Sequence, residues 1–190
     1  LEEVKIDTDN TAQPFRLTVQ WVNRPNLDFR GFSGTIASGS INVGDEIIAL
    51  PSAKKSKVSL IVGGKGEQNI AISGQAITLC LEDEIDISRG DVIAKINDRP
   101  ETTDQFQAHL IWMHNENMLP GRPYLIKTNN KIIDGAVSEL RHKVNVNSLE
   151  HESGKVLELN EIGLVNIKTS EPIAFDAYKD NKSMGSFILI

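Results

Sequence analysis

The sequence predicts an all-β protein with many short strands arranged as a sandwich or a barrel. Apolar residues alternate with polar ones at a period of two, which is typical of strands with one buried face. Glycine and proline interrupt these runs at short intervals, as expected where tight turns join short strands. No segment carries the continuous apolar stripe of an amphipathic helix of normal length.

The first strand is expected at residues 15–21, where apolar and polar side chains alternate without a break. Alternation assigns one set of side chains to the buried face of a sheet and the other set to water. The set assigned to the core is Phe15, Leu17, Val19 and Trp21, and the set assigned to water is Arg16, Thr18 and Gln20.

Further runs with the same period predict strands at 58–62, 77–81, 106–112 and 144–146. In the run at 58–62, alternation places Val58, Leu60 and Val62 on one face, with Ser59 and Ile61 on the other. These strands are expected to form the walls of the sheets.

Turn signals and helix breakers complete the secondary-structure prediction. Two Gly-Asp turns, Gly44-Asp45 and Gly90-Asp91, lead into β-branched runs that are expected to continue as strands. The strongest helix candidate, Leu149–Leu159, contains Ser153-Gly154 and is expected to hold at most a turn or two of helix.

A domain boundary is expected near the middle of the chain. Residues 97–104 are polar, contain Pro100 and offer no apolar partner for a sheet, which indicates a linker. We place this linker at residues 99–103, between a first domain at 1–98 and a second at 104–190. Residues 1–13, polar apart from Val4 and Ile6, form an N-terminal lead-in to the first domain.

Composition narrows the classes of function. The 190 residues suit two small domains, and no apolar run approaches the roughly 20 residues of a membrane helix. A net charge of −6 disfavours long-range attraction to a nucleic-acid backbone, so no nucleic-acid partner is expected. Cys80 is the single cysteine, which excludes an internal disulfide and favours a cytoplasmic setting.

No catalytic, cofactor-binding or metal-ligating set is predicted. Cys80 lies in a strand and is interpreted as a structural thiol, and the four histidines lack the spacing of known metal motifs. Gly63-Gly64-Lys65-Gly66 imitates a phosphate loop but is expected to be a hairpin loop between two strands. The acidic residues at 82–86 lack the ligand pattern of a calcium loop and are interpreted as a solvated loop.

The candidate interaction site is the loop after the first strand. It is too long for a tight hairpin, and loops of this kind often carry recognition. The residues predicted to contact another domain or a partner are Arg24, Asn26, Asp28 and Arg30. The alternative is that Phe29 and Phe32 close the end of a barrel while the charged side chains are solvated.

Motifs in this region resemble the translation-factor GTPases. The second domain of that superfamily has a Gly-x-x-Gly-Thr core followed by a valine and a Gly-Asp pair, and the residues here that resemble it are Gly31, Gly34-Thr35-Ile36, Gly39 and Val43-Gly44-Asp45. The longer phrase at 20–34 resembles the large subunits of bacterial sulfate adenylyltransferases. Residues 83–91, 119–121 and 160–163 also fit that branch.

The resemblance implies two consecutive β-barrels of the domain 2 and domain 3 type, with the last strand of the second barrel missing after Ile190. It implies a heterodimer in which a small subunit joins sulfate to ATP, giving adenylylsulfate and pyrophosphate, while the large subunit hydrolyses GTP to drive this step. These barrels would be non-catalytic and cofactor-free, because GTP and Mg²⁺ belong to a GTPase domain that is absent here. Their partners would be that GTPase domain and the small subunit. The alternative is an elongation-factor-like module that binds aminoacyl-tRNA.

Overall fold

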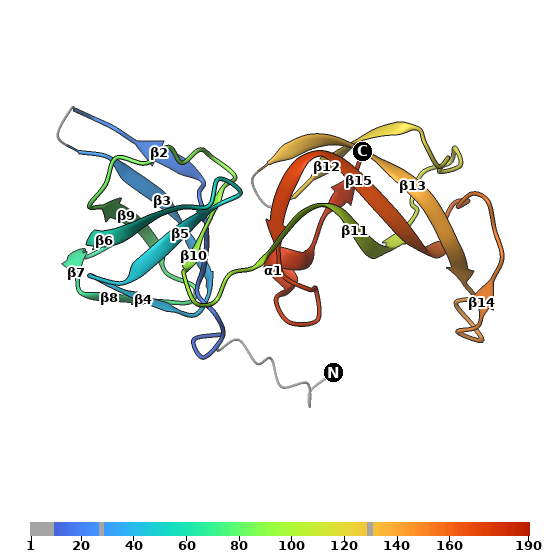
Figure 1. Cartoon of the computed structure of the whole chain (residues 1–190). Helices are drawn as coiled ribbons and strands as arrows, with labels where there is room; N and C mark the ends of the chain where they lie inside the picture. Colours follow the sequence, from blue (N-terminus) through green and yellow to red (C-terminus); the bar gives the residue numbers. More distant parts are fainter. Residues whose placement is uncertain (1–9, 27–28, 129–130) are drawn as a thin grey trace. The chain divides into compact units, whose positions relative to one another are not determined.

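The computed structural model describes residues 10–26, 29–128 and 131–190. Strands dominate these residues, and the only helix among them is the short α1 (Lys182–Gly185). The chain forms two compact units, with a division after Thr102 (Figure 1). The first unit is a closed barrel and the second is a half-barrel, so the predicted all-β class is confirmed.

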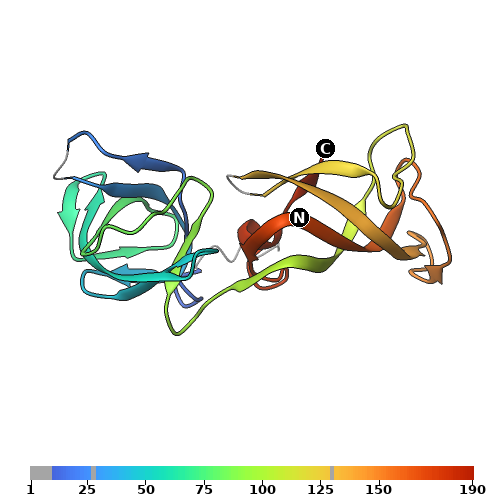
Figure 2. The ribbon, with the colours of Figure 1, turned by 45° about the horizontal axis from the view of Figure 1, so that its top comes forward.

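The first unit closes because its first and last barrel strands pair. The ring follows the order β1–β10–β5–β6–β9–β3, and an antiparallel pairing between β1 and β3 completes it (Figure 2). Its strands are β1 (Arg16–Thr18), β3 (Gly31–Ser38), β5 (Glu46–Leu50), β6 (Lys54–Gly63), β9 (Ala76–Leu81) and β10 (Val92–Lys95). Three accessory pairings add β2 (Trp21–Asn23) to β3, β7 (Gly66–Gln68) to β6, and β4 (Ser40–Asn42) to β8 (Ile70–Ile72).

The predicted first strand is broken into β1 and β2, and this changes the fate of Trp21. Phe15, Leu17 and Val19 are buried in the barrel core as expected, but Trp21 is 60% exposed, so its assignment to the core was wrong. The break occurs because β1 pairs with both β10 and β3, whereas β2 pairs with β3 alone. The alternation of faces therefore does not continue from one strand into the other.

A register shift in β6 reverses part of another prediction. The pairing of β6 with β9 is irregular between Val58 and Leu60. Val58 and Ile61 are buried in the core, while Leu60 is only half-buried, so the predicted face of Val58, Leu60 and Val62 was wrong. A β-bulge inserts one extra residue, which moves every following side chain to the opposite face.

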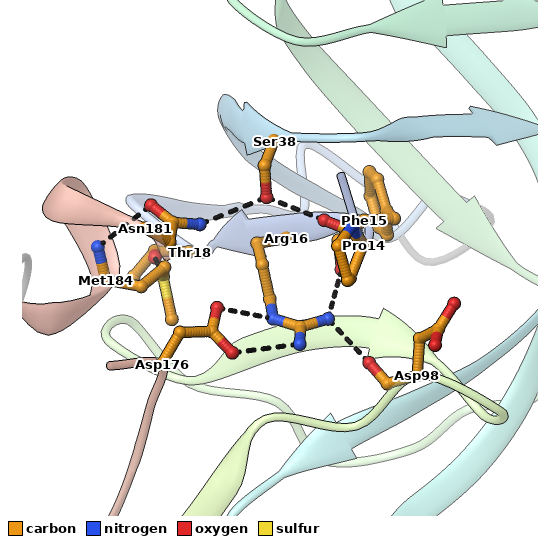
Figure 3. A network of polar contacts seen from close by, with 9 residues as sticks. All are labelled: Pro14, Phe15, Arg16, Thr18, Ser38, Asp98, Asp176, Asn181 and Met184. Atoms are coloured by element: carbon orange, nitrogen blue, oxygen red, sulfur yellow. Dashed lines mark hydrogen bonds and ion pairs between the residues drawn. The ribbon is translucent and has the colours of Figure 1, made fainter. Parts of the chain in front are cut away.

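The polar face of β1 is also buried, contrary to its assignment to water. Arg16 is only 3% exposed, and Thr18 is buried as well. Residues 174–186 belong to the first unit and supply Asp176, Asn181 and Met184 to this face (Figure 3). Alternation could not reveal this cover because it lies about 160 residues further along the chain.

Arg16 is the centre of that cover. Its Nε and Nη2 atoms donate to the two carboxylate oxygens of Asp176 at 2.8 and 2.9 Å, and Nη1 donates to the carbonyls of Asp98 and Phe15 (Figure 3). The Asn181 side chain caps α1 and donates to the Ser38 hydroxyl at 3.0 Å. A polar network therefore attaches the segment at 174–186 to the barrel wall.

The second unit is an open sheet in the order β11–β15–β13–β12–β16, with β14 paired to β13. Trp112 packs edge-to-face on Tyr124 in its core, and its indole Nε1 donates to the carbonyl of Glu116 at 2.6 Å. The strands are β11 (Glu101–Ile111), β12 (Pro123–Lys127), β13 (Ile132–Val144), β14 (His151–Glu152), β15 (Ile162–Phe175) and β16 (Ile188–Leu189).

The division between the units differs in detail from the expected domains. β11 already begins at Glu101, inside the linker expected at 99–103, and residues 174–186 return to the first unit. The helix candidate Leu149–Leu159 contains β14 and no helix. Residues 1–9 of the expected lead-in lie outside the described residues.

Candidate functional site

Two loops of opposite charge meet at one end of the first barrel. The loop between β2 and β3 carries Arg24 and Arg30, and the acidic segment after β9 carries Glu84 and Asp86. Arg24 Nη2 lies 3.6 Å from Glu84 Oε1, and Arg30 Nη2 lies 3.6 Å from Asp86 Oδ1. The expected interaction loop is therefore paired with a segment that the sequence analysis had interpreted only as solvated.

The acidic segment is anchored as well as exposed. The Ser56 hydroxyl donates to Asp83 Oδ2 at 2.8 Å, and the amide of Asp83 donates back to Ser56 at 3.1 Å. Lys54 forms a second ion pair with Asp86 at 3.3 Å. Lys54 first, and then Arg30, lower the pKa of the Asp86 carboxyl below its ordinary value.

In the predicted loop and the strand after it, Asn26 and Phe32 make contacts within the first unit. Asn26 Oδ1 accepts a hydrogen bond from the Phe29 amide at 2.9 Å. Phe32 is fully buried in the barrel core, which supports the part of the alternative that assigned it a packing role. Asp28, the fourth predicted contact residue, lies outside the described residues.

Gly31 leaves room for Phe29 on the outer wall of the barrel. A Cβ atom at position 31 would collide with the Thr78 Cγ2 atom and would lie 2.9 Å from Cε1 of Phe29. The absence of a side chain at this position is therefore what allows the Phe29 ring to fold back onto the sheet.

A pocket of about 410 Å³ lies beside this loop. Phe29, Arg30, Leu60 and Cys80 line it, and Glu82 and Glu84 lie on its acidic side. The Nε atom of Arg30 is buried and has no hydrogen-bond acceptor within the part of the chain that the structure describes. Burial raises the pKa of the Cys80 thiol, which makes it a poor nucleophile, in keeping with the structural role expected of it.

The other motifs find simple structural roles. Gly63-Gly64-Lys65-Gly66 is the turn of the β6–β7 hairpin, as predicted. Among the described residues, no group of three or more His, Cys, Asp or Glu side chains is placed to hold a metal ion. Within the same residues, no helix has the length and apolar character needed to span a membrane.

Sequence reasoning missed two groupings. The ion pairs between the two loops join segments about 60 residues apart, and their opposite charge was the one signal that pointed to them. His142 and His151 stack with their ring centroids 3.8 Å apart, because β13 pairs with β14 across a hairpin. Their separation in sequence matches no metal motif, so spacing alone could not bring them together.

Solved structures resemble this fold at low sequence identity. Sup35 complexed with GDP matches 95% of this chain with a TM-score of 0.86 and 17% identity, and the match covers 45% of that chain. Elongation factor SelB from Methanococcus maripaludis matches 92% of this chain with a TM-score of 0.72 and 21% identity, over 39% of its own length. At these identities the likeness establishes the fold alone.

Sequence relatives are much closer. Residues 105–190 match the family described as GTP-eEF1A C-terminal domain-like. Over all 190 residues, the chain is 50% identical to sulfate adenylyltransferase subunit 1 of Alteromonas mediterranea and 51% identical to that of Aliivibrio fischeri. It is 48% identical to the bifunctional enzyme NodQ of Rhizobium tropici. The chain spans 40% of the length of the first two relatives and 30% of the third. Over its full length the chain is therefore similar to a part of sulfate adenylyltransferase subunit 1, and its fold is that of translation-factor-type β-barrels.

Proposed function

We propose that this chain is the non-catalytic barrel module of a GTP-hydrolysing large subunit of sulfate adenylyltransferase. The parent enzyme would convert ATP and sulfate to adenylylsulfate and pyrophosphate in the cytoplasm, on a separate small subunit. About 50% identity to relatives of that name over the full chain is the observation that carries this proposal.

GTP and Mg²⁺ are assigned to a GTPase domain outside these 190 residues. A phosphate-binding loop needs a glycine-rich ring that opens a helix, and the Lys65 turn joins two strands instead. The role of the barrels would be to transmit the nucleotide state of that domain to the small subunit.

The loop with Arg24, Asn26, Asp28 and Arg30 is the proposed contact surface. Its ion pairs are long and lie partly in water, where such pairs contribute about 0–1 kcal/mol. The arginines can therefore exchange their present partners for groups on another domain at little cost. A planar guanidinium can pair with a carboxylate or carbonyl in one nucleotide state and lose it in the other.

The test is the substitution Arg30→Glu in the full-length complex. Loss of a state-dependent contact should reduce the GTP-dependent stimulation of adenylylsulfate synthesis by about fivefold or more, with basal synthesis little changed. Pyrophosphate release with and without GTP measures both rates.

Lys54→Glu is the matched control, because Lys54 also pairs with Asp86 but lies on β6, outside the loop. It should leave the stimulation ratio unchanged. A coupling role for Arg30 is wrong if Arg30→Glu lowers basal and stimulated rates equally, or if the protein melts at a much lower temperature.

A further inference from the structure

Arg30, which lines the pocket, has a buried hydrogen-bond donor without an acceptor among the described residues. The Arg30 side chain is 21% exposed, with Nη2 directed to Asp86 and Cζ placed 5.6 Å from the centre of the Phe32 ring. These contacts leave the buried Nε–H without an acceptor within the described residues. A desolvated donor costs free energy until it is paired, so the pocket suits an occupant that offers an oxygen atom.

The floor of the pocket is apolar and is built by three adjacent strands. Leu60 on β6 pairs with Cys80 on β9, and Cys80 pairs with Gly31 on β3, so these residues form a row on the outer face of the barrel. At the Gly31 end of this row the Phe29 ring packs onto the sheet and borders the pocket. A surface of this kind can bury an apolar side chain.

On the acidic side of the pocket, one of the three carboxylates forms no ion pair or hydrogen bond with a described side chain. Asp83 is bound to Ser56 and Glu84 is paired with Arg24. Glu82 also lines the pocket, and it forms no ion pair among residues whose placement is described. A cationic side chain next to an apolar one would complement this rim.

We propose that this pocket seats a segment of the partner subunit in which an apolar side chain is followed by Lys or Arg. The apolar side chain would rest on Leu60 and Cys80, a backbone carbonyl would accept from Arg30 Nε, and the cation would pair with Glu82. This inference rests on the proposed function, because it requires the separate subunit implied by relatives named subunit 1.

Charge and size favour a protein segment over a nucleic acid. The chain carries a net charge of −6 and the rim adds acidic side chains, both of which repel a phosphate backbone. The volume of about 410 Å³ falls within the range of roughly 300–1,000 Å³ that is typical of ligand pockets. A small anchor pocket with a charged rim is typical of the centre of a protein–protein interface.

Cys80 provides a direct probe of occupancy, since it lines the pocket and is the only cysteine among the 190 residues. The full-length large subunit is treated with N-ethylmaleimide at mildly alkaline pH, alone and with the purified partner subunit. The modification of Cys80 is followed by peptide mass spectrometry. With the partner at about ten times its Kd, the rate at Cys80 should fall about tenfold.

A pocket-filling variant tests the same idea through affinity. Ser59 is exposed and lines the pocket, so Ser59→Trp should fill it and weaken binding of the partner subunit at least about tenfold. Thr35→Trp is the matched control, because Thr35 is an exposed strand residue of the same barrel away from the pocket. It should bind the partner as the wild type does.

Each other outcome has a definite meaning. Protection by aminoacyl-tRNA instead of the partner would assign the pocket to nucleic acid. Unchanged modification in a complex that co-elutes on size exclusion would overturn the inference and leave the proposed function standing. Failure of the two subunits to associate would overturn both.

Discussion

Arg16 joins three separate parts of the chain around one guanidinium group. Its side chain is buried, forms a two-pronged ion pair with Asp176 and donates to the carbonyls of Asp98 and Phe15. A buried cation is tolerated only when its donors are satisfied, because removal from water is costly. Asp176 is therefore a structural residue of the first unit.

We expect Asp176→Asn to lower the free energy of unfolding of the first unit by about 3 kcal/mol, because the variant leaves the Arg16 charge buried without a counter-charge. Urea denaturation followed through NMR signals of the first unit measures this change. Glu84→Gln is the control, since its pair with Arg24 lies in the same unit, is exposed and should contribute less than about 1 kcal/mol. Equal effects of the two variants would contradict a special role for the buried pair.

At the scale of elements, the β13–β14 hairpin places two histidines in contact. His142 and His151 stack at 3.8 Å, and His109 and Arg141 add further positive charge nearby. Partial burial first, and then the charges of His151, His109 and Arg141, lower the pKa of His142 below its ordinary value of 6.5. The folded hairpin therefore favours neutral His142.

We expect the hairpin to lose stability as the pH falls below about 6.5, because the unfolded segment then binds a proton that the folded segment disfavours. Above that pH both states hold neutral His142, and its contribution no longer changes. NMR titration of the imidazole signals should show His142 titrating below the ordinary range. In the His151→Gln variant the pKa of His142 should move upward. An unchanged pKa of His142 in that variant would show that the stacked neighbour has no electrostatic effect on it.

At the scale of the whole molecule, the first unit is assembled from both ends of the chain. Residues up to Thr102 form the barrel, and residues 174–186 complete its outer face. Asn181 bonds to Ser38, Thr18 donates to the Met184 sulfur at 3.5 Å, and Ala174 packs against Ile48, Leu50 and Ala94. The first unit is therefore not continuous in sequence, because residues 174–186 belong to it although they follow residues of the second unit along the chain.

We expect a fragment of residues 1–102 to melt at least about 10 °C below the first unit of the intact chain. The fragment loses a few kcal/mol of stability, and each kcal/mol lowers the melting temperature of a domain of this size by about 4–8 °C. Calorimetry of both proteins measures the difference. Arg16→Met should recover part of the loss in the fragment, since it removes the unpaired buried charge. Equal melting temperatures for fragment and intact unit would show that the segment at 174–186 adds no stability.

Local pattern in the sequence located several strands, but the strand expected at 144–146 was wrong, because β13 ends at Val144 and Val146 lies exposed in a turn. Period-two alternation located β9 and β11, the Gly-Asp turns preceded β5 and β10, and the richness of the loop at 23–30 singled out Arg24 and Arg30. Alternation failed at Trp21 and after Val58, where a strand break and a bulge changed the face that each side chain presents. Both events depend on which strands pair, and pairing is a non-local property.

The sequence by itself determined the all-β class and, through its motifs, the resemblance to the large subunits of sulfate adenylyltransferases. Only the tertiary structure decided that Arg16 is buried, that Arg30 meets Asp86, and that Leu60 and Cys80 line one pocket. The physical reason is the range of the forces that act. Turn chemistry and strand alternation operate over a few residues and can be read along the chain. Ion pairs and pockets arise from residues that are 20 to 160 positions apart in the sequence and that come together only when the chain folds.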